Sequence, residues 1–96
     1  MKRYKFTATA ENDLVGIVDY SLEKWGAIKA NHYVDGLESL TSNLANNPNV
    51  GLYQEDILAD IMAFPYESHI LYYVPDSQGI TIIRVLHKRM NPHLHL

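Results

Sequence analysis

A single glycine, Gly26, separates two long stretches of helical periodicity, and this feature most constrains how the chain can fold. The apolar stripe before it consists of Leu14, Ile17, Val18, Leu22 and Trp25. The stripe after it consists of Ala30, Tyr33, Val34, Leu37, Leu40, Thr41 and Leu44. Because glycine readily takes the left-handed conformation that ends a helix, the sequence predicts two helices joined by a very short link. Such a link indicates an antiparallel helical hairpin.

Capping and helix-breaking residues mark the ends of this hairpin. We expect Thr9 or Glu11 to open the first helix, because an acidic first turn suits the positive end of the helix dipole. Pro48 disfavours helical geometry at Asn47 and ends the second helix. The predicted structural core of the hairpin consists of Leu14, Ile17, Trp25, Tyr33, Leu37 and Leu40.

Strand-like runs lie on both sides of the hairpin. Residues 4–9 alternate and are rich in aromatic and β-branched side chains, and three further runs follow a loop over 49–56, at 57–64, 69–74 and 80–87. The short turns between the last three runs imply antiparallel neighbours. The sequence therefore predicts one α+β domain over 1–96 in the order β-α-α-β-β-β. Its antiparallel sheet carries the helical hairpin on one face, and its tail, about 91–96, is flexible.

The last strand-like run carries apolar residues on both faces. One face is expected to present Ile80, Ile82, Arg84 and Leu86, and the other Thr81, Ile83, Val85 and His87. Such a strand is central, with one face under the helices. The second face then needs cover from the loops or from a partner chain, which is a first indication of an interaction protein.

Composition excludes several classes of protein. Cysteine is absent from the 96 residues, which excludes disulfides, thiol catalysis and cysteine-ligated zinc. The net charge is −3 and the sequence pI is about 5.9, whereas proteins that grip a nucleic-acid backbone usually carry a basic stripe. No apolar run approaches the roughly 18 residues of a membrane span. We expect a cytoplasmic protein that neither crosses a membrane nor binds nucleic acid sequence-specifically by itself.

Few residues point to chemistry. No phosphate loop, zinc-protease pair or nucleophile elbow occurs. The C-terminal histidines lack a nearby carboxylate, so we expect no metal and no cofactor. Arg84 with His87 could stabilise a phosphate and move a proton, as a nuclease requires. The alternative, which we favour, is that Arg84 pairs with Asp60 or Glu67 on a neighbouring strand.

Four short motifs follow one another along the chain. They are Trp25-Gly26-x3-Ala30-x2-Tyr33, Asn47-Pro48-x2-Gly51, Ser68-His69-x2-Tyr72-Tyr73 and Arg84-Val85-Leu86-His87-x-Arg89-Met90. Each motif is weak alone, but together the set resembles ParE-type toxins of the RelE/ParE superfamily, which belong to bacterial type II toxin–antitoxin systems. The resemblance covers nearly the whole chain, and the family's fold has the same β-α-α-β-β-β order.

The resemblance implies a toxin of the plasmid-stabilising kind that inhibits DNA gyrase by binding, without catalysis, and that a ParD-type antitoxin holds inactive. The alternative is the RelE branch, whose members cleave messenger RNA on the ribosome; Arg84 matches a functional arginine there, and His87 would assist it. A second arginine expected after the Gly51 loop is missing. Related ParE chains commonly carry basic residues around Leu58, Met62 and Ala63, which are apolar in this chain. These departures argue against ribonuclease activity.

The candidate target-binding site is the basic cluster at the end of the last strand. It consists of Arg84, His87, Lys88, Arg89 and Met90. Its charges could meet an acidic target surface or be masked by acidic side chains of the antitoxin. The antitoxin is expected to cover apolar surface on the hairpin and the sheet.

Overall fold

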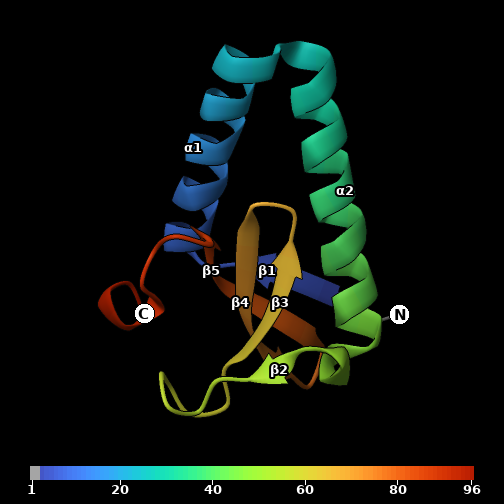
Figure 1. Ribbon diagram of the computed structural model, residues 1–96. Coiled ribbons are helices and arrows are strands. Elements are labelled where there is room, and N and C mark those ends of the chain that lie inside the picture. The colour runs from blue at the N-terminus through green and yellow to red at the C-terminus, as the bar shows by residue number, and fades with distance from the viewer. Residues whose placement is uncertain (1–2) are drawn as a thin grey trace.

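The computed structural model, which describes residues 3–96, has two layers, a helical hairpin and a five-stranded sheet (Figure 1). The hairpin consists of α1 (Ala8–Trp25) and α2 (Ala27–Asn46). The strands are β1 (Arg3–Phe6), β2 (Leu52–Tyr53), β3 (Met62–Tyr66), β4 (His69–Asp76) and β5 (Gly79–His87). The short 3-10 helices are η1 (Pro48–Val50) and η2 (Pro92–Leu94). The predicted α+β order is confirmed, with the two-residue β2 as an addition.

The sheet is mixed rather than purely antiparallel. Its strand order is β1-β5-β4-β3-β2. As predicted, β3, β4 and β5 form an antiparallel meander. The predicted antiparallel sheet is wrong for β1, which pairs in parallel with β5. Because the whole hairpin follows β1, no short turn ties β1 to an antiparallel neighbour, and it joins the free edge of β5 instead.

Several element boundaries differ from the prediction. α1 begins at Ala8, because Thr7 and not Thr9 or Glu11 is its N-cap; the Thr7 hydroxyl accepts the Ala10 N–H at 3.1 Å. The strand expected over 4–9 therefore ends at Phe6. The strand expected over 57–64 begins only at Met62. Residues 54–61 form turns that are held by their own backbone hydrogen bonds.

The link between the helices is Gly26 alone, as its position in the sequence predicts. Its φ of 86° lies in the region that favours glycine. Its backbone N–H donates to the Leu22 carbonyl at 3.0 Å, and α2 begins at the next residue. The two helices share one apolar core with the sheet.

This core lies between the hairpin and the sheet. Of the residues predicted for it, Ile17 and Leu37 are buried, and Leu14, Tyr33 and Leu40 are half-buried and pack against it. The prediction that Trp25 belongs to the core is wrong, because this residue is 40% exposed. The hairpin extends past the sheet, so no strand of residues 3–96 lies opposite its joined end (Figure 1).

A bulge in β5 changes the predicted faces of that strand. Tyr73 pairs with Ile82 and Tyr72 pairs with Arg84, so Ile83 is an extra residue. Val85 consequently packs in the helix-side core with Ile80 and Ile82, whereas the simple alternation placed it on the opposite face.

The second face of the sheet is covered by the chain itself. The buried residues there are Ile61, Tyr72 and Leu86. They are covered by Ile57, from the turn segment over residues 54–61, and by Leu96 at the chain end. Residues 91–96, expected to be a flexible tail, include η2, and Leu96 contacts this face. Loops thus supply the cover that the apolar pattern of the last strand required. Within residues 3–96, no helix is long and apolar enough to cross a membrane.

Candidate functional site

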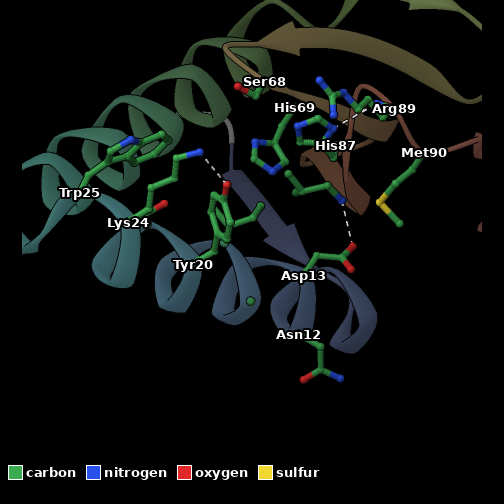
Figure 2. A pocket seen from close by; sticks show the side chains of 14 residues that line it. Asn12, Asp13, Tyr20, Lys24, Trp25, Ser68, His69, His87, Arg89 and Met90 are labelled. Carbon is green, nitrogen blue, oxygen red and sulfur yellow. Dashed lines mark hydrogen bonds between the residues drawn. The ribbon is translucent and has the colours of Figure 1, made fainter.

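A groove of about 620 Å³ lies between α1 and the ends of β4 and β5 (Figure 2). Its apolar floor includes Ile17 and Val85, and Tyr20 lines its helical side. Gly16 also lies on the helical side, and a Cβ added there would meet nothing within 4 Å. The groove therefore owes part of its depth to a missing side chain on α1.

The structure brings part of the predicted basic cluster to this groove. His87, Arg89 and Met90 line it (Figure 2). Lys88 is exposed beside them, and its backbone N–H donates to the Ser68 carbonyl at 2.9 Å. Arg84 is not among the lining residues and faces elsewhere.

Arg84 is engaged by Asp13, which the sequence did not indicate as its partner. Its Nε and Nη2 donate to the two carboxylate oxygens of Asp13 at 2.8 and 2.9 Å, and Nη1 donates to the His95 carbonyl at 2.8 Å. Hydrogen bonding to Asp13 raises the pKa of Arg84. The predicted partners Asp60 and Glu67 are therefore wrong, although the prediction of an ion pair is right.

Asp13 reaches Arg84 because β1 is short. β1 covers β5 only as far as Ile82, so the next backbone groups of β5 need other partners. Thr7 donates its hydroxyl to the Ile83 carbonyl at 2.9 Å, and Asp13 accepts the Val85 N–H at 3.0 Å. The start of α1 thus completes the edge of β5, a contact between residues 72 positions apart.

A chain of hydrogen bonds joins α2 to the sheet beside the groove. Tyr33 and His69 are bonded through the hydroxyl and Nδ1, and the Tyr66 hydroxyl donates to the Tyr33 carbonyl at 2.7 Å. A Cβ on Gly36 would collide with the Tyr66 hydroxyl. Gly36 is therefore required for the close approach of this tyrosine.

His69 and His87 are adjacent polar residues of the groove wall. Their rings meet edge to face, with centroids 5.4 Å apart. Burial, together with the neighbouring His87, lowers the pKa of His69. Burial raises the pKa of Tyr33 to about 12, so at neutral pH the tyrosine keeps its proton and His69 is uncharged. His69 appears in the Ser68-His69 motif, but only the fold shows its neighbour.

The joined end of the hairpin carries exposed apolar side chains above the groove. Trp25 lies at the groove mouth, with its ring 6.2 Å from those of Tyr20 and Tyr33. Lys24 donates to the Tyr20 hydroxyl at 3.0 Å (Figure 2). Leu22 is 44% exposed and Ile28 is 77% exposed.

The three apolar positions where related chains are expected to be basic have different surroundings. Met62 is buried in the helix-side core. Ala63 packs against the core on the other face of the sheet, and Leu58 is exposed in the turn segment. Of the three, only Leu58 lies where a charge would reach solvent freely.

The chain is similar to proteins of one family. A family model described as the ParE toxin of the type II toxin–antitoxin system parDE matches residues 4–92. Toxin ParE1 of Caulobacter vibrioides is 33% identical over 96 residues, which cover 100% of this chain and 99% of that protein. Toxin ParE1 of Mycobacterium tuberculosis is 31% identical over 90 residues, which cover 93% of this chain and 92% of that protein.

Solved structures support the fold. A chain of the chromosomal ParDE toxin–antitoxin system from P. aeruginosa superposes with a TM-score of 0.75 and 22% identity. The superposition covers 91% of this chain and 96% of the other.

Proposed function

The chain belongs to the ParE toxin family of type II toxin–antitoxin systems, and from this premise we propose that it inhibits DNA gyrase by binding and that a ParD-type antitoxin neutralises it. Gyrase as the target also implies that the chain acts in the cytoplasm.

The engagement of Arg84 is the observation that favours binding over ribonuclease catalysis. A nuclease needs free cationic donors that converge on the scissile phosphate. Asp13 holds two sides of the Arg84 guanidinium, and the His95 carbonyl holds a third. Breaking this pair would leave the Asp13 carboxylate, which is only 14% exposed, without its partner. Arg84 therefore fits a structural role.

Lys88, Arg89 and Met90 are the residues that we propose meet the target. All three are exposed at the end of β5, and Arg89 and Met90 also line the groove. Exposed cations beside an apolar surface suit an acidic protein surface, and such binding weakens with salt.

A supercoiling assay tests this function. The purified chain should inhibit gyrase, and prior mixing with the antitoxin encoded beside it should restore supercoiling. A Lys88→Gln, Arg89→Gln double variant should need a higher concentration, whereas His87→Gln should have a mild effect because no proton transfer is involved. Cleaved transcripts in expressing cells, with supercoiling unaffected, would instead establish the ribonuclease alternative.

A further inference from the structure

The two histidines of the groove each have Nδ1 occupied by a neighbouring group. The backbone N–H of Arg89 donates to Nδ1 of His87 at 3.1 Å. Since a backbone N–H can only donate, this Nδ1 carries no proton, and the neutral ring carries its proton on Nε2. At His69, Nδ1 shares a hydrogen bond with the Tyr33 hydroxyl, and when the hydroxyl is the donor this ring also carries its proton on Nε2. His87 therefore presents Nε2–H as a donor, and His69 presents the same donor when Tyr33 donates to its Nδ1.

These two donors are adjacent and belong to the groove. The rings stand edge to face at an interplanar angle of 82° and both line the groove, above α1 in Figure 2. The Nδ1 edge of His69 faces α2 through Tyr33. Its Nε2–H lies on the far side of the ring, away from that contact. A neutral pair of this kind suits an oxygen acceptor and does not suit a metal ion, which would require unprotonated Nε2 atoms.

The other charges of the groove favour a negatively charged acceptor. Lys24 and Arg89 line it. Among the described residues that line it, Asp13 is the one carboxylate, and Arg84 already neutralises it. The groove thus offers donors and positive charge, with no free carboxylate in its wall to satisfy them.

We propose that the Nε2–H groups of His69 and His87 receive one carboxylate from an acidic side chain of the antitoxin. This inference rests on the proposed function. The groove is far larger than a free inorganic anion needs, and Ile17, Val85 and Met90 give it apolar surface. An amphipathic segment, in which apolar side chains flank one Asp or Glu, would use both properties.

A carboxylate at this place makes antitoxin binding depend on pH. The groups that face the histidines are Tyr20 and Lys24 from α1, the paired Asp13, Tyr33 from α2, and Arg89 after β5. None of these supplies a free negative charge. A bound carboxylate would therefore favour the protonated form of His69, and the complex should tighten as pH falls toward 6.

The first test concerns the free chain. Long-range ¹H–¹⁵N NMR spectra at neutral pH distinguish the two neutral tautomers. We expect His69 and His87 both to carry the proton on Nε2. A proton on Nδ1 of either ring would overturn the proposal, whatever the antitoxin does.

The second test measures the affinity of the antitoxin for matched variants. His87→Leu removes the donor and should weaken binding about 10- to 100-fold, as for the loss of a hydrogen bond to a charged group. His87→Gln keeps an N–H donor at nearly the same place and should recover most of the affinity. His95→Leu, a histidine outside the groove, is the control and should bind like the wild type. Equal affinity of His87→Leu and the wild type would overturn the proposal while leaving the proposed function intact.

The third test identifies the acidic side chain. Each Asp and Glu of the antitoxin is changed to its amide, and each variant is combined with His87→Leu in a double-mutant cycle. One position should show coupling, and the pKa of His69 should rise on binding of the wild-type antitoxin only. Additive losses at every position would refute the proposal.

Titration with sodium phosphate and sodium glutarate separates the two sources of an oxyanion. Neither should saturate the histidine signals below the millimolar range. Micromolar saturation would assign the site to a free anion and overturn the proposal. Failure of the antitoxin to bind the wild-type chain at all would overturn this proposal together with the proposed antitoxin.

Discussion

The two ends of the helical hairpin carry similar apolar stripes but differ in burial. At the open end, Ala10 of α1 and Leu44 of α2 are 0% and 1% exposed. At the joined end, Trp25 is 40% exposed and Ile28 is 77% exposed. Strands β1 and β5 lie under the open end, whereas the joined end extends beyond the sheet (Figure 1). An apolar stripe is therefore a buried face only over the length that a second element covers.

The groove lies where the hairpin changes from its covered end to its uncovered end. Ile17, which is buried, and Trp25, which is exposed, both line it. Its histidine wall is attached to α2 through Tyr33. The uncovered end of the hairpin thus supplies exposed apolar surface, and the covered end keeps that surface in place.

The largest expected effect is at the covered end. Leu44→Ala should lower the free energy of unfolding by about 2–5 kcal/mol, because it leaves a cavity in the helix-side core. Ile28→Ala, at the joined end, should change it by less than about 0.5 kcal/mol. Urea denaturation of both variants gives the comparison. Similar losses in the two would show that the joined end is buried in solution.

A pair of glycines tests the contact between α2 and the sheet. Gly36→Ala should cost about 1–3 kcal/mol, because the new methyl displaces the Tyr66 hydroxyl from its bond to the Tyr33 carbonyl. Gly16→Ala places the same methyl in open space on α1 and should stabilise the protein by about 0.5–1 kcal/mol through helix propensity. Thermal melts measure both. A stabilised Gly36→Ala variant would contradict the packing of Tyr66 against α2.

Trp25→Ala should have a smaller effect on stability than its size suggests. Complete burial would predict a loss of about 3–5 kcal/mol. The exposed ring keeps an edge-to-face contact with Tyr20 and a tilted contact with Tyr33, and aromatic pairs contribute about 0.5–1.5 kcal/mol. We expect urea denaturation to show a loss of about 1 kcal/mol in the free energy of unfolding. We expect the affinity for the antitoxin to fall by a larger factor than the equilibrium constant for folding. A variant that unfolds at a far lower urea concentration would show that Trp25 is buried in the core.

The smallest expected effect is the pH dependence that His69 adds. Its folded-state pKa lies below the ordinary value of 6.5, so below that pH the unfolded state binds more protons. The contribution of His69 to stability is present above about pH 6.5 and is lost as pH falls through the folded-state pKa. The urea midpoint of the wild type should therefore fall on acidification more than that of His69→Asn. If the urea midpoints of the two proteins fell equally with pH, the pKa of His69 would not be lowered in the folded protein.

Local signals in the sequence were sufficient for the two helices and four of the five strands, in their order. Helical spacing on both sides of Gly26 determines the hairpin, because a one-residue link allows little else. Turn residues between the last three strands determine their antiparallel pairing in the same way. The motif residues also led to the family, although none of them by itself identified the groove.

The tertiary structure decided the features that depend on where separate elements end. The exposure of Trp25 follows from the length of the hairpin, which extends beyond the sheet. The parallel pairing of β1 and the bulge at Ile83 likewise became visible only in the folded chain. The same holds for the Asp13–Arg84 pair, which forms because β1 stops short of the end of β5. Periodicity reports which face of an element is apolar, but it carries no information on how far the opposite element extends. The buried core, the edge contacts and the groove were therefore determined only when helices and strands of unequal length were brought together.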